Sequence, residues 1–189
     1  MVADQMRGVL FLVVGPSGAG KDSVIDGARR RLAETHSIDF PRRFVTRPAD
    51  AGGEDHLPLC DETFARMEAA GAFALSWRAH GLAYGVPASV AQDLAAGRSV
   101  VVNVSRAVID EARRLFQPLR VLVVTAPPAI LAARLAGRGR EDAADIEARL
   151  ARGGRYELAG PDVVTLVNDG PLETAIERCV ALLCEPLAA

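Results

Sequence analysis

A glycine-rich segment near the start of the chain carries the clearest chemical signal in the sequence. It reads GPSGAGKDS from residue 15, so that Gly15 and Gly20 bracket four residues and Lys21 follows. Glycines let the backbone curl until its N–H groups point at phosphate oxygens, and a following helix adds its positive dipole end. Lys21, the only lysine of the chain, would add a slim charge for the β- and γ-phosphates. The segment predicts a phosphate-binding loop, although an ordinary strand–turn–helix junction is the alternative.

Asp22 is unusual, because such loops commonly carry Ser or Thr at this position to hold a magnesium ion. A carboxylate is a suitable ligand for Mg²⁺. It also brings negative charge close to a nucleotide phosphate, which favours a contact through water over a direct one. Ser23 could supply a hydroxyl instead. We therefore expect Asp22 and Ser23 to be the metal-binding residues of an ATP·Mg²⁺ site.

Two groups of basic residues stand out along the rest of the chain. One group, with a histidine, comprises Arg42, Arg43, Arg47, Arg78 and His80, and the other comprises Arg134, Arg138, Arg140 and Arg149. Guanidinium groups suit phosphate oxygens, and arginines that close over a transferring phosphoryl group stabilise its charge. The alternative is a solvated helix face with ion pairs, such as Arg149 with Asp145 or Glu147.

Short apolar strands alternate with helical stretches around these residues. Expected strands are 8–14, 99–104, 119–124 and 162–167, and expected helices are 20–34, 105–116, 127–137 and 170–184. This alternation is typical of an α/β fold with a parallel sheet and helices on both faces. Residues 39–86 break the rhythm with a Pro- and Gly-rich stretch, a helix at 61–70 and a hairpin-like segment, and 134–154 are polar and helical with a glycine break. We expect one domain: a core (1–38, 87–133 and 155–189), an inserted lobe (39–86) and a lid (134–154).

The composition excludes several classes of protein. The 189 residues carry a net charge of -2, so nothing draws the whole chain to nucleic acid or to a membrane surface. No apolar run is long enough to span a bilayer, and the N-terminal apolar run leads straight into the glycine loop, unlike a signal peptide. Three cysteines without paired spacing indicate reduced thiols, so we expect a cytoplasmic protein. The oligomeric state is left open, and a homodimer is one option.

Five motifs, in order along nearly the whole chain, resemble the guanylate-kinase-like nucleoside monophosphate kinases. They are GPSGAGK, VTRP with GGE, W–HG–YG, RL with RGRE, and VNDG with LE. The resemblance implies a three-layer P-loop NTPase fold with a small acceptor-binding lobe and an arginine-bearing lid. Guanylate kinases, however, read guanine with acidic side chains. Ser76 and Ser105 stand in their places here, Arg43 replaces a serine that helps hold the base, and a second GMP-binding arginine falls near Asp50. Loss of those partners disfavours GMP as the acceptor.

GKDS, TRPADAGGEDH, WRAHGLAYG and VNVSRAV look instead like the ribose 1,5-bisphosphate phosphokinases of bacterial phosphonate degradation. This resemblance implies that ATP and ribose 1,5-bisphosphate give ADP and 5-phosphoribosyl 1-diphosphate, and that Asp22 marks this branch. A guanylate kinase, a kinase of another small phosphorylated sugar and a non-catalytic scaffold module remain the rival interpretations. Scaffold modules of this superfamily have lost the glycine loop, whereas this chain keeps Gly15, Gly20 and Lys21.

These considerations assign expected roles to individual residues. The ATP-binding residues are Gly15, Pro16, Ser17, Gly18, Ala19, Gly20, Lys21, Asp22, Ser23, Arg134, Asn168 and Asp169. The acceptor-binding residues are Arg43, Arg47, Arg78, His80, Tyr84, Asn103, Ser105 and Arg106. The catalytic residues are Lys21, Arg138, Arg140 and Arg149. The acceptor is a phosphate that is already anionic at neutral pH, so no general base is required.

Overall fold

The structure is a computed structural model that describes residues 8–35, 37–49, 54–137 and 158–186. The chain divides into two compact units, one of residues 1–12 and 35–119 and the other of residues 13–34 and 120–189. The predicted division into core, lobe and lid stays a prediction. No helix in the described ranges has the length and apolar content to cross a bilayer.

A five-stranded sheet has the strand order β2–β7–β1–β8–β9. Its strands are β1 (Leu10–Val14), β2 (Ile38–Asp39), β7 (Ser99–Asn103), β8 (Leu119–Thr125) and β9 (Val163–Val167). β2 pairs in parallel with β7, and β8 pairs in parallel with β9. Every residue of β1 is buried, as expected for a continuous apolar strand within a parallel sheet. The predicted α/β class with a parallel sheet is confirmed.

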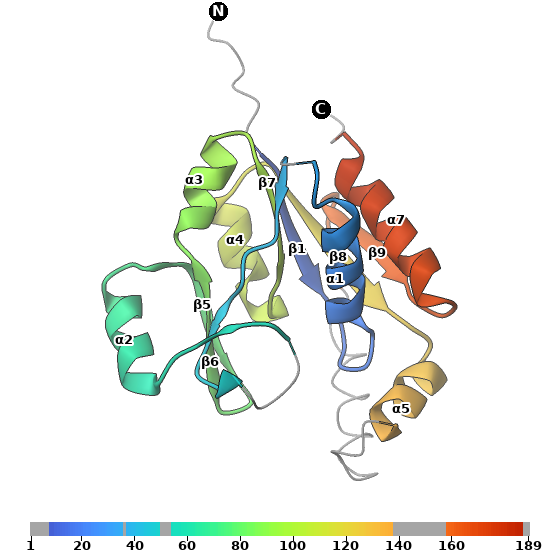
Figure 1. The fold of residues 1–189 in the computed structure, drawn as a ribbon, viewed down its shortest axis with the longest axis horizontal. Coiled ribbons are helices and arrows are strands. Elements are labelled where there is room, and N and C mark those ends of the chain that lie inside the picture. The colour runs from blue at the N-terminus through green and yellow to red at the C-terminus, as the bar shows by residue number, and fades with distance from the viewer. Residues whose placement is uncertain (1–7, 36, 50–53, 138–157, 187–189) are drawn as a thin grey trace, which may run out of the picture. The chain divides into compact units, whose positions relative to one another are not determined.

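In the unit of residues 1–12 and 35–119, a second sheet has the order β4–β3–β6–β5. Its elements, with the helices of this unit, are β3 (Phe44–Val45), β4 (Leu57–Pro58), α2 (Asp61–Ala69), β5 (Phe73–Ala79), β6 (Leu82–Pro87), α3 (Ser89–Ala95), the 3₁₀ helix η2 (Arg106–Val108) and α4 (Ile109–Leu115). The predicted hairpin is the antiparallel pair β5–β6, and α2 packs against it (Figure 1). Its turn contains His80 and Gly81, both with a positive φ.

The unit of residues 13–34 and 120–189 contains α1 (Lys21–Arg31), α5 (Pro128–Ala136) and α7 (Leu172–Cys184). α1 and α7 lie side by side (Figure 1). Their contact is close, because a Cβ on Gly27 would lie 2.2 Å from Cδ1 of Ile176. The helix predicted at 20–34 spans only Lys21–Arg31, and the helix predicted at 105–116 is η2 followed by α4.

Candidate functional site

The glycine loop connects β1 to α1, as the sequence predicts, and two of its glycines are required by close contacts. A Cβ on Gly15 would lie 1.9 Å from the carbonyl oxygen of Val124 on β8. Gly20 has a φ of 83°, and its Cβ would lie 2.6 Å from Nδ2 of Asn168. Pro16, Ser17, Gly18 and Ala19 lie between these glycines. No side chain fits at either position without shifting the loop.

Lys21 is the first residue of α1, and its ammonium group bonds to the loop itself. Nζ donates to the carbonyl oxygens of Gly15 at 2.9 Å and Pro16 at 3.1 Å. The side chain thus folds back across the loop and brings its charge to the loop's own backbone. An ammonium has three N–H donors on one nitrogen, so it can bond to carbonyl oxygens or to phosphate oxygens at the same position. A guanidinium has a planar fork of donors and would need acceptors in a different arrangement.

Asp22 and Ser23 occupy the first turn of α1, and both residues are exposed. One carboxylate and one hydroxyl are hard oxygen donors, and Mg²⁺ commonly takes one or two protein oxygens while phosphates and water complete its shell. Among the described residues no three His, Cys, Asp or Glu side chains gather around a common metal position. The donor set therefore fits a nucleotide-borne magnesium ion, and it does not form a metal cage of its own.

Asn168 follows β9 and is the most deeply buried polar side chain near the loop. It is 3% exposed, and Nδ2 donates to the carbonyl oxygen of Ala19 at 2.9 Å. Its Oδ1 is buried and has no donor among the described residues. Asp169, the next residue, is exposed. Asn168 and Asp169, both expected at the adenine edge, therefore differ in environment. Asn168 is buried and bonded to the loop, whereas Asp169 is exposed.

Arg134 lies on α5, which contacts the same loop. A Cβ on Gly18 would lie 3.2 Å from the carbonyl oxygen of Leu131 and from Cγ of Leu135 on this helix. Nη1 of Arg134 is buried and finds no acceptor in the described part of the chain. A buried guanidinium N–H without an acceptor calls for a partner, and a phosphate oxygen is a suitable one.

In the other unit, a cationic and aromatic cluster forms around Arg43, which is 8% exposed. Its guanidinium pairs with the carboxylate of Glu54 and lies 5.5 Å from the ring centre of Trp77 and 5.4 Å from that of Tyr84. The two rings are stacked, with centroids 5.3 Å apart. Burial raises the pKa of Tyr84, and the charge of Arg43 opposes this. Arg43 and Tyr84, both predicted to bind the acceptor, are thus neighbours.

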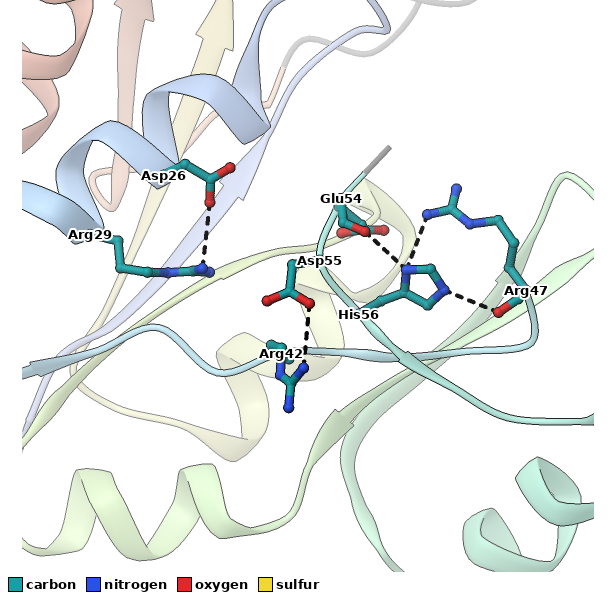
Figure 2. Close-up of polar contacts among 7 residues, drawn as sticks. All are labelled: Asp26, Arg29, Arg42, Arg47, Glu54, Asp55 and His56. Carbon is teal, nitrogen blue, oxygen red and sulfur yellow. Dashed lines mark hydrogen bonds and ion pairs between the residues drawn. The ribbon is translucent and has the colours of Figure 1, made fainter. Parts of the chain in front are cut away.

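Arg47 follows β3, and both its backbone and its side chain lie close to His56. His56 is 5% exposed, with Nε2 3.0 Å from the backbone oxygen of Arg47 and Nδ1 3.3 Å from Nη2 of the same residue (Figure 2). Nε of Arg47 is buried and lacks an acceptor within the described ranges. Sequence analysis did not select His56. A histidine whose partners are largely backbone carbonyls leaves no side-chain pattern to find.

Arg78 lies apart from this cluster, on the opposite face of β5 from Trp77, because alternate strand residues point to opposite faces. Both of its terminal nitrogens donate to Glu68 of α2, at 3.1 and 2.6 Å, and Ser76 donates to the same carboxylate at 2.6 Å. These donors, Arg78 first, lower the pKa of Glu68 to about 2. The structure does not bring Arg78 together with Arg43 and Tyr84.

The remaining predicted residues have the following positions. Asn103 ends β7, Ser105 accepts a hydrogen bond from the backbone of Ala107 as the cap of η2, Arg106 begins η2, and His80 is in the β5–β6 turn. η2 packs against β5, so Ser105 and Arg106 lie close to the hairpin. The predicted lid residues Arg138, Arg140 and Arg149 lie outside the described residues.

Comparison with known proteins relates this arrangement to one group of enzymes. The chain is 48% identical to the ribose 1,5-bisphosphate phosphokinase PhnN of Pseudomonas fluorescens, over 95% of each chain. It is 63% identical to that of Acidiphilium cryptum, over 77% of each chain. The chain belongs to the PhnN family of ribose 1,5-bisphosphate phosphokinases. No protein-family model matches the chain.

Solved structures related to this PhnN-family chain support the fold. A guanylate kinase from Anaplasma phagocytophilum matches 95% of this chain and 86% of its own, with a TM-score of 0.68 and 18% identity. A gluconokinase from Sinorhizobium meliloti covers 95% of this chain and 93% of its own, with a TM-score of 0.51 and 19% identity. The predicted guanylate-kinase-like P-loop fold is confirmed for this member of the PhnN family.

Proposed function

We propose that the protein transfers the γ-phosphoryl group of ATP to the 1-phosphate of ribose 1,5-bisphosphate, giving ADP and 5-phosphoribosyl 1-diphosphate. The observation that carries this proposal is the 48% identity to a ribose 1,5-bisphosphate phosphokinase over 95% of both chains. An intact glycine loop with Lys21 supports catalysis rather than a scaffold role. The pathway that we infer is phosphonate breakdown, as expected from the sequence.

ATP binding is assigned to the loop between Gly15 and Gly20, with Lys21 and Arg134. The loop amides and the ammonium of Lys21 bind phosphate oxygens, and the unsatisfied Nη1 of Arg134 donates to another. Asp22 and Ser23 hold Mg²⁺, which neutralises charge on the phosphates when it is bound. Asn168 keeps Ala19 in place through a 2.9 Å hydrogen bond. In this proposal these residues orient the donor, and none of them exchanges a proton.

The acceptor is assigned to the cluster of Arg43, Arg47 and Tyr84, with Asn103, Ser105 and Arg106 as further contacts. A phosphate monoester has a second pKa near 6, so its oxygen is anionic at neutral pH and can attack without a base. A bond forms between an oxygen of the 1-phosphate and the γ-phosphorus while the bond to the ADP oxygen breaks. The chain's task is to align two polyanions and offset their repulsion, a task that suits guanidinium groups.

A panel of acceptors tests the proposal. The purified protein is given ATP, Mg²⁺ and one acceptor at a time: ribose 1,5-bisphosphate, ribose 5-phosphate, or GMP. ADP release is measured by a coupled assay. We expect ribose 1,5-bisphosphate to give a kcat/KM at least about a hundredfold above GMP, because Ser76 and Ser105 replace the carboxylates that read guanine in guanylate kinases. Preference for GMP would refute the proposal, and preference for ribose 5-phosphate would support the rival sugar-phosphate kinase.

A further inference from the structure

His56 is buried, yet it belongs to no predicted role. Its side chain lies between the two segments that flank residues 50–53, and both of its ring nitrogens have close polar neighbours (Figure 2). Nε2 lies 3.0 Å from the backbone oxygen of Arg47. Nδ1 lies 2.9 Å from the backbone oxygen of Glu54 and 3.3 Å from Nη2 of Arg47. Two of these three contacts are to Arg47.

The chemistry of the ring links these contacts to its charge. A neutral imidazole has one donor and one acceptor. With the hydrogen on Nε2, the ring donates to the backbone oxygen of Arg47, and Nδ1 can then accept only from the guanidinium, since a carbonyl cannot donate. The doubly protonated ring would instead donate to Glu54 and face Arg47 as a second cation. In both states Nε2 donates to the backbone oxygen of Arg47, and in the neutral ring with its hydrogen on Nε2, Nδ1 also accepts from the guanidinium.

Arg47 lacks a carboxylate partner among the described residues, although two carboxylates are close in sequence. Glu54 pairs with Arg43. Asp55 pairs with Arg42 at 3.4 Å (Figure 2). Nε of Arg47 is buried without an acceptor in the same part of the chain. The guanidinium thus keeps both charge and a directed N–H for an incoming anion.

The backbone around Arg47 is fixed as well. Thr46, the preceding residue, exchanges two bonds with Ala83 of β6: its amide donates to the carbonyl oxygen at 3.0 Å, and its hydroxyl accepts from the amide at 2.8 Å. Ala83 precedes Tyr84 of the acceptor cluster. The side chain of Arg47 is left to be oriented, and His56 lies within hydrogen-bond distance of its guanidinium.

We propose that His56 is a positioning residue for Arg47, holding its guanidinium so that it binds a phosphate of the acceptor. The inference rests on the proposed function for the identity of that acceptor. His56 itself touches no substrate. Its effect on acceptor binding must therefore pass through Arg47. An experiment that removes Arg47 can then distinguish this role from direct binding and from a purely structural role.

A double-mutant cycle on the full-length protein tests the proposal, using His56→Ala, Arg47→Ala and the double variant. Calorimetry gives the Kd of ribose 1,5-bisphosphate without ATP, and kinetics give kcat and both KM values. We expect His56→Ala to raise the Kd and KM of the acceptor about tenfold, with kcat and the KM of ATP within about twofold. In the Arg47→Ala background the same change should alter the Kd less than about twofold.

Two further variants keep the test sharp. His56→Asn retains an acceptor near Nδ1, so it should recover much of the lost affinity, and it replaces the alanine variant if that protein does not fold. Asp55→Asn breaks only the neighbouring pair with Arg42 and should leave the Kd unchanged. Equal losses with and without Arg47, or no recovery by asparagine, would overturn the role of His56. If the effects of His56→Ala and Arg47→Ala on the Kd are coupled but the protein shows no turnover, only the proposed reaction is overturned. If the wild-type protein does not bind ribose 1,5-bisphosphate, both the proposed reaction and the role of His56 are overturned.

Discussion

The side-chain amide of Asn168 donates a 2.9 Å hydrogen bond to the carbonyl oxygen of Ala19, joining the end of β9 to the middle of the glycine loop. The two residues are 149 positions apart in the sequence. Because Asn168 is 3% exposed, this bond is shielded from water. It makes Asn168 a structural part of the loop, whatever part the residue also takes at the adenine edge.

Asn168→Ala should therefore weaken phosphate binding in general. Losing the donor leaves the Ala19 carbonyl unsatisfied, which costs the ordered loop about 1–3 kcal/mol. Because phosphate binds the ordered loop, we expect affinity to fall by up to about a hundredfold. We expect similar losses for ATP and for tripolyphosphate, which has no base, measured by calorimetry. A loss confined to ATP would instead assign Asn168 to base recognition. Asp169→Asn, at the exposed position that follows Asn168, is the matched control and should leave tripolyphosphate affinity unchanged.

Lys21→Ala should abolish turnover without unfolding the protein. Nζ donates to the loop carbonyls of Gly15 and Pro16, so the core does not depend on it. We expect kcat/KM to fall about a thousandfold or more, as when a key transition-state donor is removed. The melting temperature, followed by circular dichroism, should move by only a few degrees. Substantial activity in Lys21→Ala, or in Lys21→Arg at the wild-type level, would contradict the assignment of the loop.

The contact between α1 and α7 predicts a stability defect for Gly27→Ala. Alanine would gain about 1 kcal/mol of helix propensity, but its Cβ would overlap Cδ1 of Ile176, 2.2 Å away. We expect a net loss of about 1–3 kcal/mol in the free energy of unfolding, measured by urea denaturation. The Ile176→Ala background removes the overlap, so Gly27→Ala should there be neutral or stabilising. An equal cost in both backgrounds would rule out this contact as the cause.

Glu68 predicts a specific feature of the acid stability. Arg78 and Ser76 lower the pKa of its carboxyl to about 2, below the ordinary value of 4.5. A lowered folded-state pKa stabilises the fold above pH 4.5, and this contribution is lost as the pH falls from 4.5 to 2. The pair is partly exposed, so the effect is less than about 1 kcal/mol. Urea titrations between pH 2 and 6 should show a shallower acid decline for Glu68→Gln, and Arg78→Gln should share it; parallel curves for all three proteins would contradict the pairing.

Much of the fold, including the place of the glycine loop between β1 and α1, followed from the sequence. The loop was predictable because Gly15, Gly20 and Lys21 have a spacing that backbone geometry and charge both require. β1 and β7 were predictable because continuous apolar runs indicate buried parallel strands. The three two-residue strands β2, β3 and β4 were missed, since two residues show no periodicity, and α3 was missed because its seven residues follow a strand ending in Val86 and Pro87.

The acceptor side was less predictable, because contacts there depend on tertiary structure. Arg43, Arg47 and Arg78 look alike in the sequence, yet the first pairs with Glu54, the second contacts His56, and the third pairs with Glu68. Strand alternation alone separates Arg78 from Trp77, but only the pairing of β5 with β6 shows that Tyr84 lies opposite Trp77. Side chains bonded to backbone carbonyls, such as His56 and Asn168, leave no partner residue in the sequence to identify.

The chemical structure of the product tests the central claim most directly. The protein is incubated with ATP, Mg²⁺ and ribose 1,5-bisphosphate, and ³¹P NMR follows the phosphorus signals, with Lys21→Ala as the inactive control. The account predicts a new pair of coupled diphosphate signals on the sugar, beside the unchanged 5-phosphate signal, in step with ADP. If the sugar keeps two monoester signals while GMP is converted to GDP under the same conditions, the account is wrong.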